Sequence, residues 1–131
     1  MRCPSCSHPL IILELDDVEI DYCTKCEGIW LDSGELELLL EDSARKDKLL
    51  ASFRPFSGNK EKKRKCPICS KKMEKVLVDS EKKITLDRCE NNCGLWFDKG
   101  ELMDVIEIGS ITEDNKVIRL LQEMFEYKIK K

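Results

Sequence analysis

The chain carries one pattern twice, and the second copy begins 66 positions after the first. Residues 21–36 read DYCTKCEGIWLDSGEL, and residues 87–102 read DRCENNCGLWFDKGEL. Asp, Cys, Gly, Trp, Asp, Gly, Glu and Leu recur at that one offset without a gap. Each copy is preceded by a Cys-Pro-x-Cys segment, at residues 3–6 and 66–69. Many identities at a constant offset indicate an internal repeat, so the sequence predicts two copies of one small cysteine module.

The cysteines favour metal binding over disulfides. All eight fall in four pairs, and the chain begins Met1-Arg2-Cys3, so we expect no secretory signal before the first pair. No apolar run approaches the roughly 20 residues that cross a bilayer, so we expect a cytoplasmic protein without membrane contact. Paired cysteines in that setting are typical metal ligands. Modules of about 60 residues also have marginal cores, which a bound metal would stabilise.

The spacing predicts a zinc ribbon in each copy. Alternating apolar residues indicate strands at 10–15 and 18–22, and at 76–78 and 84–88. Such a hairpin would return the second cysteine pair of a module to the first. Four thiolates from two turns suit tetrahedral Zn²⁺, so we expect two zinc ions per chain. The predicted ligands are Cys3, Cys6, Cys23 and Cys26 for one ion, and Cys66, Cys69, Cys89 and Cys93 for the other.

Short helices are predicted after each ribbon. Asp32-x-x-Glu35 and Asp98-x-x-Glu101 could be acid/base pairs, but an apolar helical pattern follows each, which favours helix capping. Second helices are expected at about 44–53 and 112–127. The predicted fold class is a small metal-stabilised α+β fold of two tandem zinc ribbons, each followed by a short helical pair. The predicted domains are 1–53 and 66–131, joined by a linker with a basic run at 54–65.

Partner contacts are predicted at three places. Trp30 and Trp96 carry large apolar surfaces that could pack in the core or face a protein partner. The stretch 60–83 holds ten Lys or Arg against four acids, and Lys62, Lys63 and Arg64 are its candidate phosphate contacts. The whole chain has a net charge of −3, which argues against general nucleic-acid binding. The wide apolar face expected for helix 112–127 could form a dimer.

The combined motif CPxC…DxCxxCxGxWLDxGEL resembles the transcription-factor-IIB-type zinc-ribbon family of small prokaryotic proteins. The first copy matches it at all four cysteines and the second at Cys66, Cys69 and Cys89, and both match at the Gly, Trp, Asp, Gly, Glu and Leu positions that follow. The second copy departs at its fourth ligand, because Asn92 stands where the offset predicts cysteine and Cys93 follows it. The resemblance implies zinc binding. It also implies a transcription-linked role, through analogy with the ribbon of the general factor.

Three functional classes remain open at this point. The first is a zinc-binding ribbon that docks on protein or nucleic acid. The second is a rubredoxin-like iron carrier of electrons, because its ligand set is the same. The third is a thiol redox switch, which needs a reactive thiolate of low pKa. Enzymatic hydrolysis is disfavoured, since a catalytic zinc keeps one coordination position open and four cysteines would close it. We therefore expect a binding module and not an enzyme.

Overall fold

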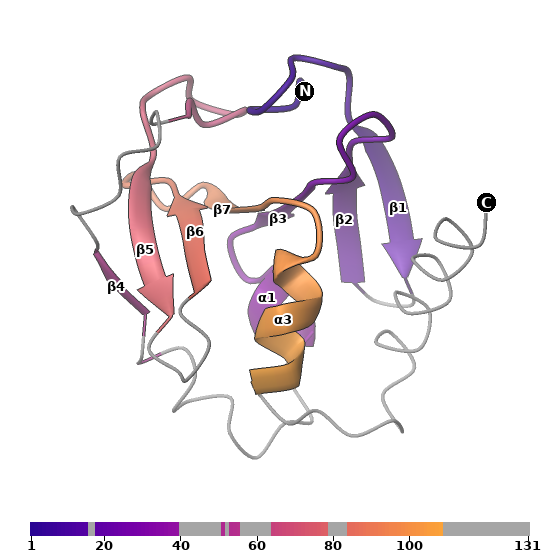
Figure 1. Ribbon diagram of the computed structural model, residues 1–131. Helices are drawn as coiled ribbons and strands as arrows, with labels where there is room; N and C mark the ends of the chain where they lie inside the picture. The colour runs from indigo at the N-terminus through magenta and orange to yellow at the C-terminus, as the bar shows by residue number, and fades with distance from the viewer. Residues whose placement is uncertain (16–17, 40–50, 52, 56–63, 79–83, 109–131) are drawn as a thin grey trace.

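The computed structural model describes residues 1–15, 18–39, 51, 53–55, 64–78 and 84–108. Within them, seven antiparallel strands form one sheet in the order β1-β2-β3-β7-β6-β5-β4 (Figure 1). The first copy gives β1 (Ile11–Leu15), β2 (Val18–Tyr22), β3 (Ile29–Asp32) and helix α1 (Glu35–Leu39). The rest are β4 (Phe53–Pro55), β5 (Glu74–Val78), β6 (Ile84–Arg88), β7 (Gly94–Phe97) and helix α3 (Glu101–Ile108).

The two copies meet where β3 pairs with β7. These strands occupy equivalent places in the repeat, and their antiparallel register sets Trp30 opposite Trp96. Ile29 lies opposite Phe97 and Leu31 opposite Leu95, so the pairing is symmetric about the two tryptophans. In a two-fold symmetric dimer, the same surface of each subunit contacts its counterpart in the same way. The repeat thus forms an internal pseudo-dimer.

The predicted domain division at 1–53, 54–65 and 66–131 stays a prediction. Strands from both predicted domains nevertheless share the sheet described above. Arg54 and Pro55, which fall in the predicted linker, belong to β4 and pair with Leu77 and Val76 of β5. Because β4 is at the edge of the sheet, it tolerates a proline, which lacks an N–H donor.

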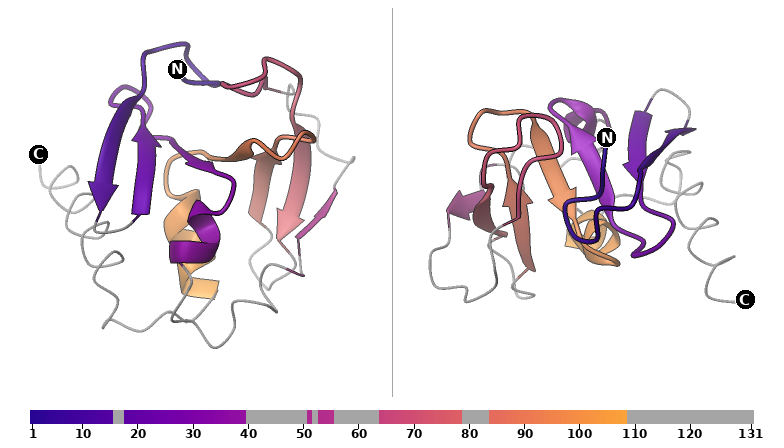
Figure 2. Two further views of the ribbon diagram at one scale, coloured as in Figure 1. Left: turned by 180° about the vertical axis from the view of Figure 1, so that it is seen from behind. Right: turned by 90° about the horizontal axis from the view of Figure 1, so that it is seen from above.

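One face of the sheet is covered by the helices. Successive strand residues point to opposite faces, and on this face the apolar ones pack into a single core. In Figures 1 and 2 both helices lie at the centre of the molecule, by the junction of β3 and β7. The buried members of this core are Val18, Ile20, Tyr22, Ile29, Leu31, Leu36, Val78, Ile84, Leu86, Phe97, Leu102 and Val105. Since both copies supply this core, each copy depends on the other for its burial.

The opposite face carries one row of residues across six strands. The strand registers set Ile12, Asp21, Trp30, Trp96, Asp87 and Lys75 side by side in that order. The row is symmetric about the two tryptophans except at its ends, where the first copy has Ile12 and the second has Lys75. The cysteine pairs lie on this face, packed with the tryptophans and Met73 in a second buried cluster.

The predicted helical pairs are corrected by the structure. The described residues are mostly antiparallel strand, with one short helix following each ribbon. Phe53, expected at the end of the helix predicted at 44–53, begins β4 instead and pairs with Val78. Ala51 is helical, whereas residues 44–50 and 52 and the predicted helix 112–127, with its dimer surface, lie outside the described residues. No helix within the described ranges is long and apolar enough to span a membrane.

The predicted helix caps form in part. In the second copy Glu101 Oε1 accepts the main-chain N–H of Asp98 at 2.7 Å, as a capping box requires. Helix α3 itself begins at Glu101, after Gly100, whose carbonyl accepts the N–H of Asp104 at 3.1 Å and whose φ is +84°. In the first copy Glu35 accepts the N–H of Glu19 instead, at 3.1 Å. The capping prediction was therefore wrong about which residue starts the helix.

Candidate metal centres

Three of the four cysteine turns share one backbone conformation. Ser7, Glu27 and Ser70 each follow the second cysteine of a pair and have φ of 64–65°. The N–H of each donates to the carbonyl of the first cysteine of its pair, at 2.9 Å in all three turns. This closure holds both thiols on the same side of the turn. Each turn therefore presents two sulfurs to the centre of its cluster.

The hairpins bring the four thiols of each copy together. In each copy, the four sulfurs all lie within 4.8 Å of one another. Cys3 Sγ is 3.5 Å from Cys26 Sγ, and Cys6 Sγ is 3.5 Å from Cys23 Sγ. These separations are too long for a disulfide, which measures about 2.0 Å. They are close to the roughly 3.8 Å edge of a tetrahedron with 2.3 Å zinc–sulfur bonds.

Main-chain donors point at several of these sulfurs. Cys3 Sγ accepts the N–H groups of Ser5 and Cys6 at 3.3 and 3.4 Å. Cys23 Sγ accepts that of Cys26, and Cys66 Sγ that of Ile68, both at 3.4 Å. A thiolate accepts such bonds more strongly than a thiol does. The turns are thus built to hold negative sulfur.

The thiols of one cluster cannot all ionise without a cation. Burial is the main cause that raises the pKa of Cys3 far above its usual range. At Cys23 burial acts in the same direction, but the hydrogen bond from Cys26 N–H and its neighbours lowers the pKa to about 7. In the other cluster burial and the neighbouring thiols raise the pKa of Cys93 to about 12. A divalent cation would supply the charge that lets all four deprotonate. The donor set therefore fits a metal ion.

The fourth turn, between Cys89 and Cys93, differs from the other three. It contains one extra residue, and Asn92 takes up the left-handed conformation with φ of 61° just before Cys93. Asparagine tolerates left-handed backbone angles, so Asn92 accommodates the extra residue. Within the described part of the chain, no main-chain N–H donates to Cys89 Sγ. Asn91 of this turn donates its side-chain Nδ2 to Cys69 Sγ of the other cysteine pair, at 3.7 Å.

Both tryptophans are fully buried, at 0% exposure. Each indole packs against the other copy: a Cβ on Gly28 would overlap the Trp96 ring, and one on Gly94 would lie 2.8 Å from Trp30 Cζ2. The indole N–H of Trp30 donates to Asp32 at 2.8 Å, and that of Trp96 to Asp98 at 3.0 Å. The predicted partner-facing role of Trp30 and Trp96 is therefore corrected, because neither side chain reaches the surface.

Arg64 is partly buried and is held by carboxylates. It pairs with Asp98 and, at 3.4 Å, with Asp87. Asp87 is also 2.7 Å from Lys75 Nζ, and both of these side chains are buried. Lys62 and Lys63, the other predicted phosphate contacts, lie outside the described residues. Of the three basic candidates, Arg64 thus contributes to the fold.

Asp21 is the equivalent of Asp87 in the first copy, and its neighbours are different. Asp21 is 4% exposed, and Ile12 stands opposite it where Lys75 stands opposite Asp87. Burial, followed by the negative charge of Asp32, raises the pKa of Asp21 to about 6. Sequence reasoning missed the burial of Asp21 and Asp87. The available signal was their recurrence two residues before a cysteine in both copies.

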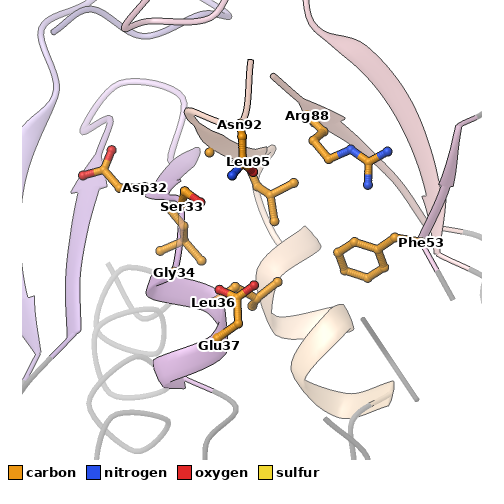
Figure 3. Close-up of a pocket in the computed structure, with 11 residues that line it drawn as sticks. Asp32, Ser33, Gly34, Leu36, Glu37, Phe53, Arg88, Asn92 and Leu95 are labelled. Atoms are coloured by element: carbon orange, nitrogen blue, oxygen red, sulfur yellow. The ribbon is translucent and has the colours of Figure 1, made fainter. Parts of the chain in front are cut away.

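A small cavity of about 180 Å³ lies between the copies, and no cysteine lines it (Figure 3). Its lining includes Phe53, Arg88, Asn92 and residues 31–34, which precede α1. Arg88 already donates to Glu74 at 2.7 Å, so its charge is used in a cross-strand pair. None of the predicted ligands or basic contacts lines this cavity.

Comparison with known protein families supports the division of the chain into two copies. Residues 2–42 and 65–108 each match the family described as transcription factor zinc-finger, of the TFIIB zinc-ribbon type. The two matches cover both cysteine clusters and both helices α1 and α3. No curated protein matched the chain. No solved structure matched it either.

Proposed function

Because the chain belongs to the TFIIB-type zinc-ribbon family, we propose that it is a zinc-stabilised docking protein with one Zn²⁺ in each cysteine cluster. The observation that carries this proposal is the convergence of four thiols within 4.8 Å in each copy. Four thiolates saturate a tetrahedral zinc ion and leave no position for water or substrate. The role of the metal is therefore structural, and the protein is not an enzyme.

The metal contributes to folding. Bringing four partly buried thiols together has a conformational and electrostatic cost, which an ion bound only in the folded state offsets. Apparent binding energies of structural zinc at neutral pH are on the order of 10 kcal/mol. The two sites thus stabilise a sheet in which all seven described strands have five residues or fewer.

Docking is the activity proposed for the assembled protein. Protein is the expected main partner, and nucleic acid is a further partner through the basic stretch 60–83. The transcription-linked role rests on the family, and the cytoplasmic location on the sequence. A dimer through residues 112–127 remains part of the proposal.

Metal analysis of the purified full-length protein tests the first part. We expect two zinc ions per chain, a colourless protein, and unfolding by circular dichroism when a strong chelator is added. Thiol titration should detect few reactive thiols before chelation and all eight afterwards. A red protein with bound iron would favour an electron carrier. Freely reactive thiols at full metal loading would favour a redox switch.

A further inference from the structure

A wide cleft separates the first cysteine turns of the two copies. Its cavity volume is about 910 Å³, within the range of ligand-binding clefts. In Figures 1 and 2 the N-terminal segment and the loop that leads into β5 run side by side at one end of the molecule. The lining residues are Met1, Arg2, Cys3, Pro4, Ser5, Ser7, Arg64, Lys65, Cys66, Pro67, Ser70 and Lys72. The cleft therefore exists only because the two copies are joined.

The charge of the lining is of one sign. It contains arginine and lysine side chains from both copies but neither Asp nor Glu. Lys65 and Lys72 are exposed and pair with each other through an antiparallel bridge, which sets both side chains on one face of the turn. Arg2 forms the equivalent bridge in the first copy, with Pro9. Arg64 is not included among the cations that would bind a ligand, because it is paired with Asp98 and Asp87.

The cysteines that line the cleft present little thiol surface to it. Cys3 and Cys66 line the cleft but are only 3% and 2% exposed. Their sulfurs accept main-chain N–H groups of their own turns at 3.3–3.4 Å. No ion pair of Lys65 or Lys72 occurs among the described residues. Their ammonium groups therefore remain available to a ligand.

The chemistry of the lining selects among anionic ligands. A docked peptide draws most of its affinity from apolar anchors in pockets, and the apolar lining here is limited to Met1 and two prolines. No aromatic side chain lines the cleft, so unpaired bases have nothing to stack on. Cations with the hydroxyls of Ser5, Ser7 and Ser70 are instead suited to phosphate oxygens.

We propose that this cleft binds the phosphodiester backbone of nucleic acid, without base recognition, through Arg2, Lys65 and Lys72. This inference rests on the proposed docking function and gives it a place and a partner class. Binding should depend on strand charge and not on sequence. Single strands and duplexes present the same phosphates, and the experiment below separates them.

The test uses zinc-loaded full-length protein and fluorescence anisotropy with a labelled 20-nucleotide single strand and a labelled 20-base-pair duplex. The expected result is binding that weakens steeply with salt. Lys65→Glu with Lys72→Glu should reduce affinity at least tenfold and lower the salt slope by about two. The matched control, Lys25→Glu with Lys71→Glu, makes the same charge change at exposed lysines outside the cleft and should cost less than threefold. The nucleic acid that binds more tightly, single strand or duplex, is the form that the cleft prefers.

Several outcomes would overturn the inference. One is equal loss in the cleft variant and in the control, which would indicate only a general charge effect. Another is an absence of binding to both nucleic acids at 50 mM salt. A third is stronger binding of a labelled poly-glutamate peptide, which would make the partner an acidic protein. Metal content is measured on every sample. If the protein holds two zinc ions but binds no nucleic acid, only the proposed role of the cleft is wrong. If it holds no zinc, the proposed function itself is wrong.

Discussion

Trp30 and Trp96 lie directly opposite each other in the pairing of β3 with β7, on the axis that relates the two copies. Each ring packs against the glycine that follows the second cysteine pair of the other copy. The two rings also belong to the same buried cluster as cysteines of both sites. The metal centres are therefore linked through packed side chains, although they share no ligand.

Substitution of Gly28 by Ala tests this packing. The added methyl group would overlap the Trp96 ring, so we expect a loss of about 1–3 kcal/mol in unfolding free energy. Chemical denaturation of the zinc-loaded protein measures the loss. Combining Gly28→Ala with Trp96→Phe should cost less than the sum of the two single substitutions, because phenylalanine lacks the ring atoms that the methyl group meets. Additive costs would show that the glycine is needed for another reason.

Loss of one metal site should weaken the other. In Cys23→Ser the first cluster loses a ligand, and the disorder should reach the Trp30–Trp96 contact. We expect the intact second site to lose zinc to a chelator at least tenfold more readily than it does in the unchanged protein. A metal-sensitive dye and tryptophan fluorescence follow the titration. Cys89→Ser is the reciprocal variant, and unaltered zinc affinity at the remaining site in both would mean that the centres act independently.

The two ends of the row offer a reciprocal exchange, although Ile12 is 63% exposed and Lys75 only 5%. Ile12→Lys would set an ammonium group opposite Asp21, as Lys75 is set opposite Asp87. The pKa of Asp21 is raised to about 6 by burial, so its ionisation opposes folding as the pH rises from about 4 to 6. We therefore expect Ile12→Lys to stabilise the protein by about 1 kcal/mol at pH 8 and by much less at pH 4.5.

The opposite exchange, Lys75→Ile, should destabilise the protein by about 3–5 kcal/mol, since among the described residues it leaves buried Asp87 with only the longer ion pair to Arg64. Both variants are compared with the unchanged protein by denaturation across pH 4.5–8. Stabilisation by Ile12→Lys that did not change with pH would indicate that Asp21 is not its partner.

The sequence predicted the elements that depend on local spacing. The two hairpins and the cysteine clusters follow from repeat identities and turn chemistry, which neighbouring residues determine. The join between the copies could not be predicted in the same way. It depends on the packing of Trp30 against Gly94, which belong to different modules. Alternation of apolar and polar residues predicts which face of a strand is buried, but it does not predict which strand will pair with it. Phe53 was misassigned because its burial depends on Val78, whose strand lies in the other copy.

Glu101 gives the clearest prediction for pH dependence. Burial raises its pKa from 4.5 to about 7, although the N–H of Asp98 partly offsets this, and the charges of Asp98 and Asp87 add to the rise. A carboxyl group with a higher pKa in the folded state binds its proton more tightly there. Its ionisation therefore opposes folding progressively between about pH 4.5 and 7.

Glu101→Gln keeps an oxygen acceptor for the Asp98 N–H but removes the titrating charge. We expect the variant to match the unchanged protein near pH 4.5 and to exceed it by about 2 kcal/mol at pH 8. Denaturant midpoints are recorded for both proteins with zinc present, so that protonation of the cysteine ligands affects both alike. Glu37→Gln, at an exposed position on α1, is the control and should show no pH-dependent gain. A gain of equal size at pH 4.5 would mean that the amide stabilises the helix start through hydrogen bonding, and that the buried charge of Glu101 is not the cause.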